Sequence, residues 1–192
     1  MSAEERREQL LDVATELVGE QGFHAVSIEA VARRAGISRP IVYKHFGDLA
    51  TLLEAMLERE AERALGQLGE VIPSELASDR AQALLAVLRG YLETVRADPI
   101  TWRLVLMPPE GAPETLREQI TQGRDAVVAI LSQLVGSGLG GAPRPPDPEL
   151  TARMISAIAD EGARLMLTDP ERFPIDRVIN QAAWMLEQLD TG

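Results

Sequence analysis

The stretch from Ser27 to Phe46, SIEAVARRAGISRPIVYKHF, constrains the fold of this chain more than any other part of the sequence. Its first half places apolar residues at positions i, i+3, i+4 and i+7, which predicts a helix of about two turns with one buried face. Ser27 is a good N-cap for that helix, and Gly36 is suited to the position that follows its last turn. The pattern therefore predicts a short helix that ends at a tight turn.

A second short helix is expected after that turn. Ser38 can cap it, and Pro40 falls in its first turn, where the missing N–H of proline breaks no internal hydrogen bond. Val42 and Phe46 form an i, i+4 pair that we expect to be buried. The side chains left to face outward are Arg39, Ile41, Tyr43, Lys44 and His45.

Two short helices joined by a turn that contains glycine, with basic and hydrogen-bonding side chains on the free face of the second, match the helix-turn-helix design. In that design the second helix enters the major groove of DNA. This stretch carries four basic side chains and one acidic side chain, whereas the whole chain has a net charge of -11. Basic side chains gain affinity for DNA phosphates by releasing counterions. A basic, solvated face on an ordinary helical hairpin is the alternative explanation of this charge pattern.

Several spaced positions together strengthen the first interpretation. They are Gly22-Phe23, Ser27-Ile28, Val31-Ala32, Ala35-Gly36-Ile37-Ser38, Val42-Tyr43 and His45-Phe46. With this run the chain, up to about residue 55, closely resembles the N-terminal DNA-binding domain of TetR-family transcriptional regulators. The resemblance implies a homodimer, a divergent helical C-terminal domain that binds a small molecule, and release from operator DNA when that ligand binds. Many members carry a lysine where this chain has Leu49 and Ala50, so we expect one phosphate contact fewer here.

The outward-facing side chains have different predicted roles on DNA. Arg39 is the candidate for a bidentate contact with guanine, and Ile41 can meet a thymine methyl group. Pro40 belongs to the same DNA-facing start of the helix. The side chains expected to position the helix on phosphates are Ser27, Tyr43, Lys44 and His45.

The rest of the chain continues in helical patterns, and no segment alternates with a period of two, so we predict an all-α protein. We expect a helix-turn-helix DNA-binding domain over residues 1–47 and a helical effector-binding and dimerisation domain over residues 48–192, with a helix over 49–68 that links them. The last two helices are expected over about 148–168 and 174–189. The first has one apolar face, and the final helix is apolar over too much of its circumference to be buried by one neighbour within the chain. They predict a homodimer interface, and a thick monomeric core is the alternative.

The larger domain is predicted to bind its effector in an apolar pocket between helices, because thioethers and aromatic rings adapt to varied ligand shapes. The residues proposed for its lining are Tyr91, Trp102, Met107, Met154 and Met166, although each would also suit plain core. Glu161 continues the apolar stripe of Met154, so helical spacing predicts a carboxylate on a buried face. It would either pair with an arginine, Arg164 or Arg124, or contact a polar or cationic ligand.

Other function classes leave no trace in the sequence. There is no cysteine, only two histidines occur, and no HExxH, GxSxG or Walker pattern is found, so we predict no cofactor, no metal and no enzymatic activity. Gly136, Gly138 and Gly141 fit G-x-G-x-x-G, but they follow a helix instead of a strand and lead into prolines, which favours a linker over a nucleotide site. The start of the chain lacks the apolar core of a signal peptide, and no apolar run approaches 18 residues, so we expect a cytoplasmic protein without a membrane partner.

The sequence therefore predicts a transcriptional regulator, most readily a repressor that binds a pseudo-palindromic operator as a homodimer and is released by a small-molecule effector. A helical ligand-binding or enzymatic protein with a structural N-terminal hairpin is one alternative. A transcriptional activator is another.

Overall fold

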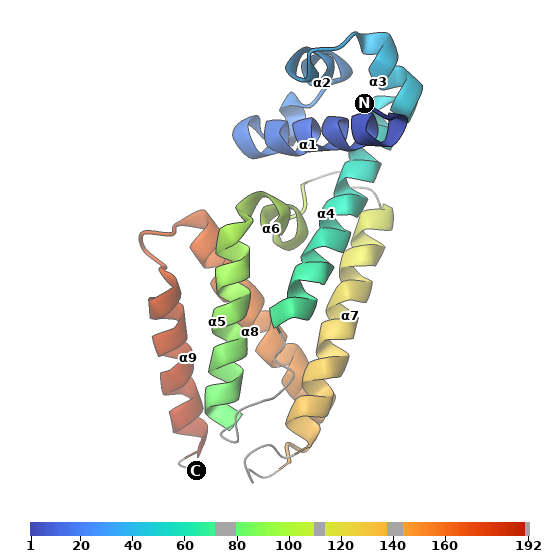
Figure 1. Cartoon of the computed structure of the whole chain (residues 1–192). Coiled ribbons are helices and arrows are strands. Elements are labelled where there is room, and N and C mark those ends of the chain that lie inside the picture. The colour runs from blue at the N-terminus through green and yellow to red at the C-terminus, as the bar shows by residue number, and fades with distance from the viewer. Residues whose placement is uncertain (72–79, 110–113, 138–143, 191–192) are drawn as a thin grey trace. The chain divides into compact units, whose positions relative to one another are not determined.

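The protein is described here by a computed structural model that covers residues 1–71, 80–109, 114–137 and 144–190. Within those ranges every regular element is a helix, and the predicted all-α class is confirmed (Figure 1). The linker predicted around Gly136, Gly138 and Gly141 lies partly outside the described residues. None of the described helices combines the length and the hydropathy needed to span a bilayer.

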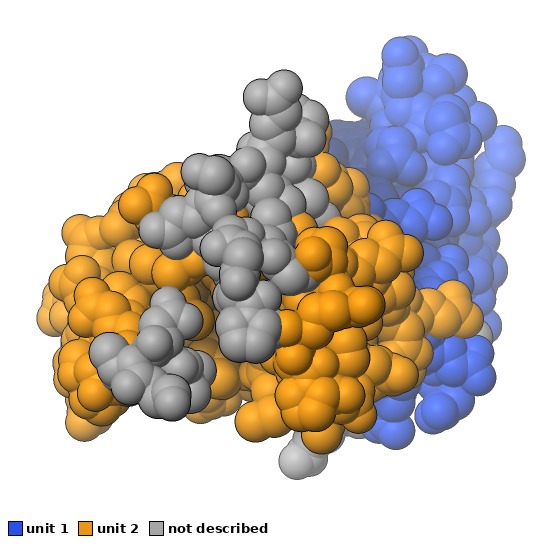
Figure 2. All heavy atoms as spheres, turned by 90° about the horizontal axis from the view of Figure 1, so that it is seen from below, with its two compact units in different colours: residues 1–64, 100–119 blue, residues 65–99, 120–192 orange. Residues whose placement is uncertain are grey.

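The contacts between residues divide the chain into two compact units (Figure 2). Unit 1 consists of residues 1–64 and 100–119, and unit 2 consists of residues 65–99 and 120–192. This division follows packing and does not decide where a DNA-binding function ends. The domain limits of 1–47 and 48–192, with a linking helix over 49–68, therefore stay a prediction.

Unit 1 is built around the predicted helix-turn-helix. Its elements are α1 (Ala3–Gln21), the 3-10 turn η1 (Phe23–Ala25), α2 (Ile28–Ala35), α3 (Arg39–Phe46), the first part of α4 (Leu49–Val71), α6 (Pro99–Leu106) and the start of α7 (Glu114–Gly136). The face of α1 that packs inward repeats at helical spacing through Leu10, Ala14 and Leu17. Val31 from α2 and Val42 from α3 are fully buried in the same core, which fixes the two short helices against α1.

A buried carboxylate joins three helices of unit 1. The side chain of Glu60, in α4, is 1% exposed and accepts hydrogen bonds from the hydroxyls of Thr15 in α1 and Thr101 in α6. One turn further along α1, a Cβ built on Gly19 would lie 2.5 Å from Cδ1 of Ile100. Small side chains on this face of α1 therefore allow the start of α6 to approach closely.

The charge of Glu60 is balanced by its neighbour in the chain. The guanidinium of Arg59 lies 2.9 Å from Glu60 Oε1, and it also lies 3.1 Å from a carboxylate oxygen of Glu8 and 2.9 Å from one of Asp12. A carboxylate taken out of water needs such partners, because an unpaired buried charge is very costly. Glu60 continues the inward stripe of Met56 at helical spacing.

Unit 2 contains the end of α4, most of α7, and the helices α5 (Arg80–Ala97), α8 (Pro148–Thr168) and α9 (Ile175–Asp190). α5 packs against both α8 and α9, and the three helices lie side by side in Figure 1. A Cβ built on Gly162 of α8 would lie 2.9 Å from Cγ1 of Val178 in α9. Gly162 therefore provides the close approach between these two helices within one chain.

The same two helices expose large apolar side chains. The exposed fractions on α8 are 55% for Leu150, 60% for Met154 and 49% for Ile158, and on α9 they are 55% for Trp184 and 39% for Met185. Single exposed apolar residues are normal on protein surfaces, but a repeated apolar face on two packed helices is a feature of interaction sites.

Candidate DNA-binding surface

The start and the end of α2 are fixed by the two residues that the sequence identifies. The Ser27 hydroxyl oxygen accepts a hydrogen bond of 3.1 Å from the backbone N–H of Ala30, which confirms the predicted N-cap. Gly36 has φ 68° and ψ 31°, a left-handed conformation that glycine adopts without steric cost. The N–H of Ile37 then bonds to the carbonyl of Ala32 at 3.0 Å. This turn sets the direction in which α3 leaves.

The start of α3 differs in one detail from the prediction. Ser38 stands at the N-cap position, but its side chain makes no capping hydrogen bond. The Ser38 carbonyl instead accepts the N–H of Ile41 at 3.0 Å, so a backbone group closes the first turn. α3 ends at Phe46 and is followed by Gly47, which has φ 76°. The Asp48 carboxylate accepts the N–H of Thr51 at 2.8 Å and so caps α4, and this backbone hydrogen bond lowers the pKa of the Asp48 carboxyl.

The two faces of α3 are separated as the sequence predicts. Val42 is fully buried and Phe46 is 4% exposed, whereas the opposite face points to solvent. The exposed residues of α3 are Arg39, Pro40, Ile41, Tyr43 and Lys44, and His45 is half-buried. The centre of the His45 ring lies 6.4 Å from the centre of the Phe46 ring. The guanidinium of Arg7 lies 5.1 Å from the centre of the Phe46 ring.

One of the four basic residues of the stretch is hydrogen-bonded to another helix. Arg34, in α2, donates hydrogen bonds of 3.1 and 2.7 Å to the two carboxylate oxygens of Glu20 in α1, and it lies 3.7 Å from Glu16. The hydrogen bond from Arg34 and its positive charge lower the pKa of Glu20. Arg34 therefore links α2 to α1. Because it is paired in this way, the number of basic residues in the sequence overstates the number available for contacts with DNA.

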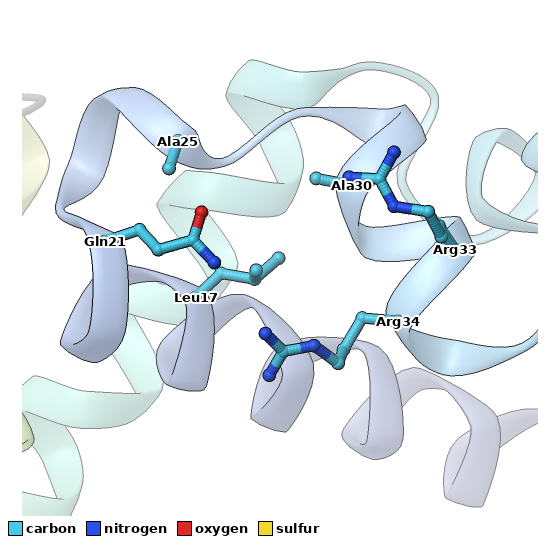
Figure 3. Close-up of a pocket in the computed structure, with 6 residues that line it drawn as sticks. All are labelled: Leu17, Gln21, Ala25, Ala30, Arg33 and Arg34. Carbon is cyan, nitrogen blue, oxygen red and sulfur yellow. The ribbon is translucent and has the colours of Figure 1, made fainter.

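Arg34 also borders a depression between α1, η1 and α2, with a volume of about 340 Å³ (Figure 3). Its lining residues are Leu17, Gln21, Ala25, Ala30, Arg33 and Arg34. Figure 3 shows Arg33 and Arg34 extending from α2, with Leu17 and Gln21 on α1. The depression contains none of the residues that the sequence predicts for an effector pocket.

The residues predicted to line the effector pocket are divided between the two units. Trp102 in α6 is 2% exposed and Met107, just after α6, is 37% exposed, and both belong to unit 1. Tyr91 and Met166 are buried in unit 2. The Tyr91 hydroxyl donates a hydrogen bond of 3.0 Å to Asp160. Burial raises the pKa of the Tyr91 hydroxyl far above its ordinary value, and the charge of Asp160 raises it further, so the hydroxyl stays protonated.

Three of the proposed residues are more exposed than the sequence predicts. Met107 and Met154 were expected inside a cavity and are exposed. The predicted burial of Glu161 is wrong, because its side chain is 60% exposed, but the predicted pair with Arg164 is present at 3.0 Å. Arg124 pairs with Asp160 instead, at 3.3 Å. Helical spacing correctly places Met154 and Glu161 on one face of α8, but spacing cannot tell whether that face is covered by the same chain.

The comparisons of this chain with known proteins agree with one another, because each finds bacterial transcriptional regulators. A family model described as bacterial regulatory proteins of the tetR family matches residues 10–56. The transcriptional activator FasR of Mycolicibacterium smegmatis is 26% identical over 178 residues, which cover 91% of this chain and 77% of FasR. The crystal structure of a tetR-family transcriptional regulator from Streptomyces coelicolor is 32% identical, covers 95% of this chain and 79% of its own, and superposes with a TM-score of 0.71.

A more distant structure shares the fold. The transcriptional regulator FadR from Bacillus subtilis, solved in complex with stearoyl-CoA, is 18% identical, covers 93% of this chain and 96% of its own, and has a TM-score of 0.70. At this identity the likeness concerns the arrangement of helices alone.

Proposed function

This chain belongs to the TetR family of bacterial transcriptional regulators, and from that premise we propose that it represses transcription as a homodimer bound to a pseudo-palindromic operator. The observation that carries the proposal is the exposed face of α3, which stands opposite the buried pair Val42 and Phe46. A homodimer would place two copies of α3 in successive major grooves about 34 Å apart. The protein would act in the cytoplasm, where its operator lies.

We assign the contacts on DNA by side-chain chemistry. Arg39 is exposed at the start of α3, where a guanidinium can form two parallel hydrogen bonds to the O6 and N7 of guanine. The 38% exposed side chain of Ile41 suits a thymine methyl group. Phosphate contacts are assigned to Ser27, Tyr43, Lys44 and His45, and Pro40 shapes the first turn of the same helix.

The dimer interface is proposed on α8 and α9. The exposed apolar residues Met154, Ile158 and Trp184 support it, because a second copy of the chain would remove this surface from water. An interface between identical chains about a twofold axis brings the same patch of each subunit together. Glu161, paired with Arg164, would then lie within or beside the interface instead of in an effector pocket.

The effector is proposed to bind between the helices of unit 2, where Tyr91 and Met166 provide buried aromatic and thioether surface. FadR was solved with stearoyl-CoA, so long-chain acyl-CoA is the first class of compound to test. An effector acts by binding one conformation of the dimer more tightly than the other. We propose that the conformation favoured by the effector holds the two copies of α3 at a separation that does not fit the operator.

The direction of regulation needs its own experiment, because the relative FasR is named as an activator. Repression and activation both begin with DNA binding by α3, and they differ in where the operator lies relative to the promoter. Transcription in vitro from a template that carries the selected operator distinguishes them. Less transcript in the presence of the protein supports the repressor, and more transcript supports the activator.

The DNA-binding proposal is tested by selecting bound fragments from random DNA with the purified full-length chain. Enrichment of an inverted repeat whose binding weakens steeply with salt is expected, because phosphate contacts release counterions. A helical ligand-binding or enzymatic protein with a structural hairpin would give no enriched sequence. In that case the regulator proposal fails for this chain.

A further inference from the structure

Two arginines of the helix-turn-helix differ in how closely each is paired with a carboxylate. Arg34 forms two short hydrogen bonds with both carboxylate oxygens of Glu20, and its side chain is 35% exposed. Arg39 has a single longer contact, 4.0 Å from its Nη1 to a carboxylate oxygen of Glu29, and both side chains are about two-thirds exposed, at 65% and 67%. The first pair is a fixed link between helices. The second pair is exposed, and breaking such a pair changes an equilibrium constant by roughly fivefold or less.

Glu29 occupies a distinctive position on the proposed DNA-binding surface. It is the only acidic residue between Ser27 and Phe46. It lies in the first turn of α2, and its carboxylate faces the residue that begins α3. A carboxylate offers a guanidinium two oxygen acceptors, and guanine offers the same guanidinium its O6 and N7. In the free protein the Glu29 carboxylate is therefore an alternative acceptor to a base edge for the Arg39 guanidinium.

We propose that Glu29 is a positioning residue that determines specificity by acting on Arg39, an inference that rests on the proposed DNA-binding function. On unrelated DNA the strongest acceptor for Arg39 is a phosphate, and the negative charge of Glu29 repels a phosphate that approaches the same guanidinium. At the operator the acceptor is an uncharged guanine, so this repulsion is smaller. Glu29 therefore disfavours phosphate-only binding more than it disfavours operator binding.

An acidic side chain in the first turn of a helix is also stabilised by the helix dipole, so the position of Glu29 alone does not require a role in recognition. A double-mutant cycle separates the two explanations. The proteins compared are the wild type, Glu29→Gln, Arg39→Ala and the double variant. Their affinities are measured for the selected operator, for an operator with the contacted guanine replaced, and for an unrelated duplex, at two salt concentrations.

Glu29→Gln is expected to raise affinity for the unrelated duplex by about two- to fivefold at the lower salt concentration, and to raise operator affinity less. The ratio of the affinity for the selected operator to the affinity for the guanine-replaced operator should fall. Both changes should disappear when Arg39 is already alanine. Glu62→Gln is the matched control, because Glu62 is exposed on α4 and its replacement removes the same charge away from α3.

The inference is overturned if Glu29→Gln and Glu62→Gln change the three affinities equally, or if the effect of Glu29→Gln persists in the Arg39→Ala background. Thermal unfolding of each variant shows whether lost binding reflects lost folding. If the wild-type chain selects no DNA, the proposed function fails and this inference fails with it. If the wild type selects an operator and the cycle shows no coupling, only the inference fails.

Discussion

Arg39 and Lys44 are both exposed on α3 and are expected to contribute to DNA binding in different ways. Replacing Arg39 with alanine should cost about 1–3 kcal/mol and relax the preference at one base pair, because a bidentate contact with guanine is lost. Replacing Lys44 with alanine should weaken all sequences about equally and reduce the salt slope by about 0.9. Gel-shift titrations against operators with single base changes, at several salt concentrations, measure both effects.

A uniform loss of affinity for Arg39→Ala, with base preference unchanged, would move Arg39 to the phosphate contacts. Unchanged DNA binding in both variants would remove α3 from the DNA-binding surface altogether.

Ser27 has one structural contact and one proposed function, and two substitutions separate them. Its hydroxyl oxygen caps α2, and its O–H is proposed to donate to a phosphate. Ser27→Asp keeps the cap, because Asp and Ser are about equally good at the N-cap, but places a negative charge near the phosphate. Ser27→Ala removes the cap at a cost of about 1 kcal/mol. Thermal unfolding together with operator binding measures both properties.

We expect Ser27→Asp to fold with nearly wild-type stability and to lose operator binding, whereas Ser27→Ala should lose stability and keep part of its binding. Retained operator affinity in Ser27→Asp would show that Ser27 acts only as a helix cap.

Among the elements, α1, α4 and α6 are joined by Glu60, Thr15 and Thr101 within unit 1. Glu60→Gln keeps the shape of the side chain but removes the charge that accepts these hydrogen bonds and pairs with Arg59. We expect a loss of about 1–3 kcal/mol in the free energy of unfolding, because hydrogen bonds to charged groups are among the stronger ones. Arg59 retains Glu8 and Asp12, which limits the loss.

Urea unfolding of Glu60→Gln and Glu62→Gln provides the measurement, because both residues lie on α4 and only Glu60 is buried. Glu62→Gln should change the free energy of unfolding by no more than about 0.5 kcal/mol. Equal effects of the two substitutions would contradict a stabilising contribution from the buried carboxylate.

The elements also show what could be predicted from sequence. The limits of α2 were predictable because the residues that decide them act locally: Ser27 caps the backbone beside it, and Gly36 adopts a left-handed conformation at little cost. The buried and exposed faces of α3 followed from helical spacing. The missing side-chain bond of Ser38 was not predictable, since the choice between hydroxyl and carbonyl depends on the geometry of a single turn.

Long-range contacts could not be predicted in the same way. Spacing alone treats Glu60 and Glu161 alike, because each carboxylate continues an apolar stripe. The structure buries Glu60 against α1 and α6 and leaves Glu161 exposed on α8. The difference depends on which helices pack against each face, and this information lies outside the helix that carries the residue. The Arg34 pair with Glu20 and the Arg39 contact with Glu29 were missed for the same reason.

For the whole molecule, binding to two half-sites requires a second copy of the chain, which we propose packs on α8 and α9. Trp184→Glu places a charge on the exposed apolar face of α9, and we expect it to raise the dimer dissociation constant by roughly thirtyfold or more, because burying an unpaired charge at an interface costs at least about 2 kcal/mol. Ile130→Glu on α7 is the matched control, since Ile130 is 45% exposed and lies on neither helix. Light scattering over a range of concentrations gives the oligomeric state.

A monomeric Trp184→Glu should also lose most of its affinity for the inverted repeat, while a dimeric Ile130→Glu should retain it. A wild-type chain that is monomeric at all concentrations, or a Trp184→Glu variant that stays dimeric, would place the subunit contact elsewhere or remove it.

The most direct test of the central claim, that the exposed face of α3 binds base edges in the major groove, is methylation interference on the selected operator. Methylation of guanine N7 blocks the acceptor that Arg39 is expected to use. We predict interference at guanines in two half-sites one helical turn apart, about 34 Å, and loss of that interference in Arg39→Ala. Binding that is indifferent to N7 methylation, or an interference pattern that Arg39→Ala leaves unchanged, would contradict the account.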